Sequence, residues 1–356
     1  MRAVLLDSSA DADWDSFVEG HPHGWICHLS DWRRVLERTF RQMRGYSLAI
    51  TDDAISPKIL AGLPVYSISS WLTGNRLVST PHASLSDPLA SSEEQMRALL
   101  DGFVELAIRL GKSRGEIRSF QATAALNGDN RFAIAQHFRS HYIPLDSEPE
   151  QLKKRFHRTC VRQRIDRALS GDLKLKHGAC EDDLRSYYHL HKQARISKKL
   201  PVHPYEFLYN LWKTFAPSGR LRLRLCEHKG IVIAGILLFC YKNRVSAEGM
   251  AWDEKCGGLS PGHFLFWNAI LEARGEGFDV FDFGRTSSVN QSLMDFKNRW
   301  GTTVVNLSQH YYPKILGQDS RRAEDHIKYK IFSQLCGITP RAAQEWLGRL
   351  AYRHLG

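Results

Sequence analysis

The sequence lacks several patterns that mark large classes of protein. No stretch of about eighteen consecutive apolar residues occurs, so no segment is predicted to cross a membrane. The start, MRAVLLDSSADADWD, reaches acidic residues too soon for a secretory signal. The seven cysteines are scattered and form no CxxC pair, which favours reduced thiols over a disulfide framework or a zinc site. We therefore expect a cytoplasmic protein without a metal ion or a tightly bound cofactor.

Negative charge is also scarce. The 356 residues include 49 Lys and Arg against 38 Asp and Glu, a net charge of +11. Such an excess predicts anionic partners: nucleotide-linked precursors, coenzyme A, nucleic acid or an anionic membrane face. The excess is concentrated in residues 153–167, where seven Lys and Arg residues stand against Asp166 alone. No recognised DNA-binding pattern accompanies it, so DNA is not an expected partner.

One order of predicted elements occurs twice along the chain. An apolar run from Ala61, a strand over 76–81, a helix over 93–110 and a strand over 116–120 form the first copy. A run from Ala234, a strand over 244–252, a helix over 263–275 and a strand over 278–283 form the second. We predict α/β domains over 1–146 and 147–315, followed by a basic helical tail over 316–356 that Pro340 divides into two short helices.

The run Phe278–Gly301 holds the most specific pattern in the chain. An alternating apolar strand ends in Asp282-Phe283-Gly284-Arg285, and residues 296–301 read FKNRWG. Charged residues beside a glycine at the end of a buried strand are typical of ligand sites in α/β proteins. A solvated basic turn is the alternative that the spacing alone leaves open.

The two motifs together resemble the closing motif of the FemAB-like branch of the GNAT acyltransferase superfamily. Other segments similar to that branch are Trp14–Val18, His28–Trp32, Ala61–Pro64, Asn75–Pro81 and Phe156–Ile165. The resemblance implies two tandem GNAT-like domains. It also implies transfer of an acyl or aminoacyl group to an amine of a cell-envelope precursor, of the peptidoglycan or exopolysaccharide kind. The loops over 84–88 and 287–291 depart from the family pattern, which leaves the substrate open.

Three residues are the catalytic candidates. Lys297 matches the lysine that the family motif marks as important for transfer, and its charge would neutralise an anionic carrier or stabilise a developing oxyanion. Asp282 would orient the amine or pair with Lys297. Glu248 lies in a predicted buried strand, where a carboxylate is costly without a partner, and is the second candidate for handling the amine.

Four arginines are the candidates for binding substrate. Arg285 would bind a carboxylate or phosphate, or form a salt bridge with an aspartate of the same run. Arg158 and Arg162 are four residues apart on a predicted helix and would form either a phosphate clamp or a solvated face. Arg195 matches a family arginine and is a candidate through that resemblance alone.

The donor site is predicted less specifically. GNAT-like folds contain two neighbouring parallel strands that splay apart, and we expect residues 231–241 and 245–252 to be that pair. Lys255, Gly258 and Ser260 loosely resemble the GNAT pyrophosphate loop, with Ser260 as the expected helix N-cap. An ordinary capped turn is the alternative.

Several alternatives stay open for the function. The donor is acyl-CoA or an aminoacyl-tRNA, and the acceptor is an anionic small molecule, a sugar nucleotide or a lipid-linked precursor. The basic tail would contact the inner face of an anionic membrane or pack on its own domain. The rival functions are an acetyl-CoA-dependent GNAT N-acetyltransferase and a catalytically degenerate tandem GNAT that binds an anionic polymer or a partner.

Overall fold

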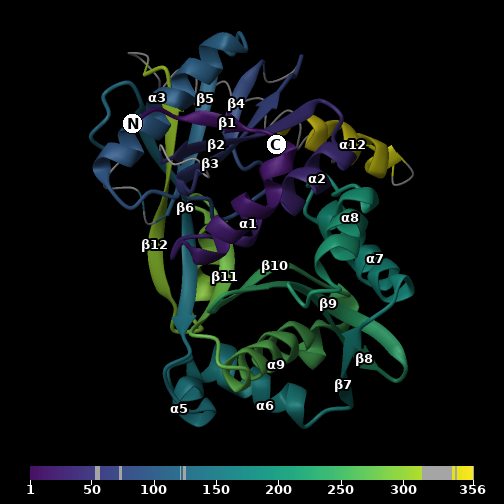
Figure 1. Ribbon diagram of the computed structural model, residues 1–356. Coiled ribbons are helices and arrows are strands. Elements are labelled where there is room, and N and C mark those ends of the chain that lie inside the picture. Colours follow the sequence, from purple (N-terminus) through teal and green to yellow (C-terminus); the bar gives the residue numbers. More distant parts are fainter. Residues whose placement is uncertain are drawn as a thin grey trace. The chain divides into compact units, whose positions relative to one another are not determined.

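A computed structural model gives the fold and describes residues 1–52, 57–71, 74–120, 122, 126–314, 339–340 and 343–355 (Figure 1). The described residues divide into two compact units. Unit 1 takes them from Met1–His137, Asn306–Lys330 and Leu350–Gly356, and unit 2 takes them from Phe138–Val305 and Ile331–Arg349.

Unit 1 contains a mixed sheet with the strand order β1-β2-β3-β4-β5-β12. The β4–β5 pair is parallel and the other pairs are antiparallel. The strands are β1 (Val4–Leu6), β2 (Met43–Thr51), β3 (Ile59–Ile68), β4 (Arg76–Ser79), β5 (Arg114–Ser119) and β12 (Thr303–Tyr312, which enters this unit at residue 306). Its helices are α1 (Asp11–Gly20), α2 (Ser30–Thr39) and α3 (Glu93–Arg109).

In unit 2 the strand order is β6-β11-β10-β9-β8-β7, and the β10–β11 pair alone is parallel. The strands are β6 (Ala133–Pro144, in this unit from residue 138), β7 (Leu173–Gly178), β8 (Leu221–His228), β9 (Ile231–Tyr241), β10 (Arg244–Trp252) and β11 (Val280–Ser287). Its helices are α5 (Pro149–Lys154), the π-helical turn η3 (Arg158–Arg162), α6 (Gln163–Leu169), α7 (Glu181–Ser197), α8 (Tyr205–Phe215), the 3₁₀ turn η4 (Glu254–Leu259), α9 (Pro261–Gly275) and α10 (Gln291–Asn298).

The predicted repeat is present in both units. The order β3-β4-α3-β5 of unit 1 recurs as β9-β10-α9-β11 in unit 2, with an antiparallel first pair and a parallel second pair in each. The prediction that residues 231–241 and 245–252 form the parallel pair is wrong, because β9 and β10 pair antiparallel along their length. The parallel neighbour of β10 is β11, which returns to the sheet through α9.

Helices cover both faces of the sheet in unit 2 (Figure 1). On one face, α9 packs against α6 and against Phe281 and Phe283 of β11. On the other face, α7 brings Tyr187 against two glycines of β9 and β10, Gly235 and Gly249, whose lack of a side chain admits the ring. The alternation along β11 thus places its phenylalanines in the α9 core and directs Asp282 to the α7 side.

The start of α9 differs from the expected cap. Pro261 occupies the first helical position as predicted. Ser260 precedes it as the N-cap residue, as predicted, but it has φ of 58° and its side chain makes no capping hydrogen bond. Its carbonyl instead accepts the backbone N–H groups of His263 and Phe264.

Only part of the basic tail is described. The second of its two expected helices is present as α12 (Gln344–Leu355), and the first lies outside the described residues. No helix within the described ranges is both long enough and apolar enough to cross a membrane.

Candidate active site

The parallel pairing of β10 and β11 is short. It comprises three residue pairs and ends at Ser246↔Asp282, although both strands continue. Beyond this point β10 is irregular between Ala247 and Gly249, and β11 is irregular between Asp282 and Arg285. Bulges of this kind are common beside active sites because they redirect side chains and end strand pairing.

Gly284 makes the irregularity in β11 possible. Its φ of 75° is one that residues with a side chain rarely adopt, and a Cβ at this position would lie 2.7 Å from the carbonyl oxygen of Ala247. The glycine of the DFGR motif therefore lets β11 pass close to the backbone of β10.

Asp282 is buried beside this glycine and is fully engaged. Arg244 forms a salt bridge with its carboxylate at 2.8 Å, and the Ser140 hydroxyl donates to it at 3.2 Å. Its Oδ1 also accepts the backbone N–H of Gly284 at 2.7 Å. The carboxylate thus ties together β6, β10 and the irregular turn of β11.

Lys297 reaches the same turn from the last turn of α10. Its side chain is buried, and Nζ donates a hydrogen bond to the Gly284 carbonyl at 2.7 Å. Burial lowers the pKa of Lys297 to about 8, although the charges of Asp282 and Glu248 act in the opposite direction. No ion pair joins Lys297 to Asp282 in the described part of the chain, because Arg244 occupies that place.

Glu248 and Arg285, the other two candidates from this region, lie on β10 and β11. Glu248 is the residue within the β10 irregularity, and its carboxylate accepts a hydrogen bond from the Ser246 hydroxyl at 2.8 Å. The guanidinium of Arg285 lies 4.3 Å from the centre of the Phe138 ring. The structure therefore gathers the three predicted catalytic residues at one end of the parallel pair, with Arg285 on the same strand.

The other predicted residues lie elsewhere in unit 2. Arg195 donates to the Pro201 carbonyl at 2.9 Å and so supports the turn after α7. Lys255 and Gly258 are exposed in η4, and Ser260 is buried at the start of α9. No hydrogen bond or ion pair among the described residues connects these four to Lys297.

Arg158 and Arg162 belong to a different surface. They begin and end η3, where Arg158 is exposed and the Nε of Arg162 is buried without a hydrogen-bond partner. The backbone N–H of His157, which precedes η3, donates to the carbonyl of Arg299 at 2.8 Å. This bond fixes η3 to the residue two positions after Lys297.

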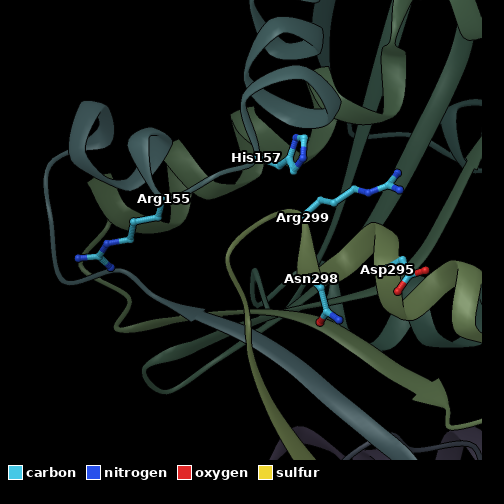
Figure 2. A pocket seen from close by; sticks show the side chains of 5 residues that line it. All are labelled: Arg155, His157, Asp295, Asn298 and Arg299. Atoms are coloured by element: carbon cyan, nitrogen blue, oxygen red, sulfur yellow. The ribbon is translucent and has the colours of Figure 1, made fainter.

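A pocket of about 420 Å³ opens at this junction and is lined by Arg155, His157, Asp295, Asn298 and Arg299 (Figure 2). Gly301 helps to hold its walls together, because it has φ of 68° and a Cβ there would lie 2.8 Å from the carbonyl oxygen of Arg155. The glycine of the FKNRWG motif thus allows two chain segments to touch.

The aromatic residues of that motif are part of the core. Trp300 is fully buried, and its ring stacks on His263 of α9 with centroids 5.6 Å apart. Phe296 lies edge-on to the same histidine, at 5.9 Å. Burial lowers the pKa of His263 to about 4. The motif therefore anchors α10 on α9 and directs Lys297 at the β11 turn.

Sequence reasoning missed several residues of the site. Arg244 lies on β10 and Ser140 on β6, and both contact Asp282 only because their strands are neighbours of β11. No sequence motif marks either residue. His141 is also buried, and its Nδ1 lies 3.4 Å from the Thr302 hydroxyl. Burial and the charge of Lys297 lower the pKa of His141 to about 4, so the ring is neutral at pH 7.

This geometry lies within the part of the chain that a known family matches. Residues 155–298 match the family described as an acetyltransferase (GNAT) domain. They form a GNAT acyltransferase domain of the FemAB-like branch. The sequence-based resemblance is thereby confirmed, and the matched family places this domain among the acyltransferases.

Solved structures support the same fold for the chain beyond this FemAB-like domain. FemX is 15% identical with a TM-score of 0.72, over 91% of this chain and 99% of FemX. L-PGS from Bacillus licheniformis is 14% identical with a TM-score of 0.59, over 94% and 98%. A tandem GNAT protein from the clavulanic acid biosynthesis pathway is 12% identical with a TM-score of 0.53, over 87% and 97%. The predicted tandem GNAT-like fold is confirmed. No curated protein sequence matches the chain.

Proposed function

We propose that the protein is an N-acyltransferase that moves an acyl or aminoacyl group to an amine of a cell-envelope or exopolysaccharide precursor. The observation that supports this most is the position of Lys297. Its buried Nζ bonds to the turn where β10 and β11 stop pairing, near two carboxylates. A lysine is costly to bury for structure alone, whereas a buried ammonium can stabilise the oxyanion that develops during acyl transfer.

The proposed reaction uses few groups. The acceptor amine attacks the acyl carbon, a C–N bond forms, and the C–S or C–O bond to the carrier breaks. The Lys297 ammonium stabilises the negative charge on the carbonyl oxygen during the attack. The amine must also lose a proton. We assign its acceptance to Glu248, which is half-buried and faces the same region.

Asp282 has a positioning role in this proposal. Its carboxylate is already bonded to Arg244, Ser140 and the backbone N–H of Gly284. It is thus poorly placed to accept a further proton. By fixing the Gly284 backbone it fixes the carbonyl that holds Lys297 Nζ.

Two donors are compatible with the comparisons. The similarity to FemX and L-PGS favours an aminoacyl donor, that is, an aminoacyl-tRNA. The acetyltransferase description of the matched family favours acyl-CoA, and the alternative function is accordingly an acetyl-CoA-dependent N-acetyltransferase. A charged tRNA or acyl-CoA and a sugar-nucleotide or lipid-linked acceptor are the partners we propose.

The test is turnover by the full-length protein with acetyl-CoA and with radiolabelled aminoacyl-tRNA, each offered nucleotide-linked sugars that carry a free amine. Lys297→Met, which keeps the length of the side chain, should reduce turnover about tenfold to a thousandfold, or about 1.4–4 kcal/mol. Lys297→Arg should restore only part of it, because the guanidinium is wider and planar.

A melting curve of each variant separates chemistry from folding. Lys174→Met is the matched control, since Lys174 is exposed on β7 and has no partner among the described residues. Full turnover in folded Lys297→Met protein would remove Lys297 from the mechanism. Absence of turnover with both donors would favour a degenerate GNAT that only binds.

A further inference from the structure

We propose that the pocket between η3 and the end of α10 holds a phosphate group of the donor. That the ligand is a donor rests on the proposed function. That it carries phosphate is argued from the residues of the pocket.

The walls of the pocket carry mainly positive charge. Of the five lining residues, Arg155 and Arg299 are cationic, and Asp295 alone is acidic. The Asp295 carboxylate accepts a hydrogen bond from Gln291 at 2.7 Å. Arg155 is held by Asp146 at 2.7 Å, whereas the exposed side chain of Arg299 has no hydrogen bond or ion pair in the described part of the chain. The guanidinium of Arg155 is thus held in place, and that of Arg299 is available to bind a ligand.

The segment next to the pocket, residues 153–167, is also positively charged. Of the seven Lys and Arg residues in 153–167, Lys153 pairs with Asp166 and Arg155 pairs with Asp146. The other five have no side-chain ion pair or hydrogen bond among the described residues: Lys154, Arg158, Arg162, Arg164 and Arg167. The buried Nε of Arg162 is a donor without an acceptor. Unpaired arginines gathered on one short segment favour a ligand with several negative charges.

The shape of the pocket favours a phosphate ester over a small anion. Figure 2 shows Arg155 and Arg299 directed toward opposite ends, with His157 and Asn298 between them. Guanidinium groups that extend in opposite directions favour a ligand with more than one polar group over a single small anion. The volume of about 420 Å³ falls within the range of sites for nucleotide-sized ligands.

The pocket also adjoins the proposed catalytic lysine. Asn298 lines the pocket and follows Lys297 in the chain. The hydrogen bond from His157 to Arg299 and the contact of Gly301 with Arg155 keep these segments in fixed register. A carrier bound by its phosphate here would therefore have its acyl end within the same part of unit 2 as Lys297.

Two donors could supply that phosphate, and direct binding distinguishes them. The probes are a fluorescein-labelled RNA hairpin with a single-stranded CCA end and, separately, coenzyme A. For the probe that binds, Arg299→Gln should weaken binding about fivefold to tenfold, because it removes a charge-assisted contact. If the RNA binds, the variant should also reduce the slope of log K against log salt by about one. The pair Arg158→Gln and Arg162→Gln should weaken binding as well.

Lys174→Gln removes one exposed unpaired charge elsewhere in unit 2 and should change binding less than twofold. Arg299→Gln should melt like the wild type, because its side chain has no partner. Wild-type affinity of Arg299→Gln for both probes would overturn the proposal, as would failure of the wild type to bind either probe. Turnover by folded Lys297→Met protein would overturn the proposed function while leaving this binding result intact.

Discussion

The two units place an acidic residue at the same point of the same parallel pair, and they surround it differently. In unit 1 the third pair of β4 and β5 is Val78↔Glu116, and in unit 2 the third pair of β10 and β11 is Ser246↔Asp282. Each pair also begins with an arginine on its first strand, Arg76 or Arg244. The repeat therefore extends from strand order to individual charges.

In unit 1 the acidic residue is neutralised within its own strand. Arg118, two residues on, binds Glu116 at 2.9 Å, and Gln309 donates to it at 3.1 Å. Burial raises the pKa of Glu116, but the charges and hydrogen bonds of Arg118, with help from Arg76, hold it below its ordinary value. The same guanidinium also donates to the carbonyls of Thr80 and Ala83. Glu116 is thus paired with a permanent cation of its own strand.

In unit 2 the position of Arg118 is taken by Gly284, the second residue after Asp282. The glycine opens the turn, and Lys297 of α10 supplies the nearby positive charge with a pKa of about 8. Asp282 is paired as well, through Arg244, so the difference lies in the buried lysine that the second unit holds beside its acid. The unit with the poised cation is the one that the GNAT family matches.

The largest expected effect is on unit 1. Arg118→Met should lower the free energy of unfolding by about 3–5 kcal/mol, because it leaves Glu116 charged and largely buried without its main partner. Turnover per folded molecule should stay near the wild-type value, since the chemistry is assigned to unit 2. Denaturant unfolding and a turnover assay on the same preparation provide the measurement.

The double variant Glu116→Gln with Arg118→Met serves as the control. It removes both charges and should recover a large part of the lost stability. The contrast between the units would fail if Arg118→Met protein were stably folded and as inactive as Lys297→Met.

Much of this contrast could be predicted from the sequence, because it depends on residues that are close together in the chain. The repeat follows from the order of apolar segments, and Lys297 and Asp282 lie in a motif of recognisable spacing. Arg244 could not be identified as the partner of Asp282, because that contact depends on β10 and β11 being neighbours. The parallel pair was assigned to the wrong strands for the same reason. The pocket likewise joins segments more than a hundred residues apart, such as Arg155 and Arg299.

An intermediate effect is expected at the turn of β11. Gly284→Ala should cost about 1–3 kcal/mol of stability, since its φ is unfavourable for alanine and its Cβ would meet the backbone oxygen of Ala247. The Gly284 carbonyl would then move away from Lys297 Nζ, so turnover should fall about tenfold.

A glycine in the corresponding strand of unit 1 gives a matched control. A Cβ on Gly115 would lie 2.6 Å from the Phe103 ring, so Gly115→Ala should also cost about 1–3 kcal/mol by overpacking. It should leave turnover per folded molecule unchanged. Equal losses of turnover in the two variants would show that general destabilisation, and not the position of the Gly284 carbonyl, controls activity.

The smallest expected effect is a shift in the pH profile. If the charged form of Lys297 is the active one, kcat should fall as the pH rises through about 8, where the ammonium loses its proton. Asp282 and Glu248 raise the pKa of this lysine, and burial lowers it further than they raise it. Asp282→Asn should therefore move the fall in kcat to lower pH, whereas Glu116→Gln in unit 1 should leave it in place. A rate that rises through pH 8 would instead assign Lys297 the role of a base, and a profile that Glu116→Gln moves as far as Asp282→Asn would remove the distinction between the units.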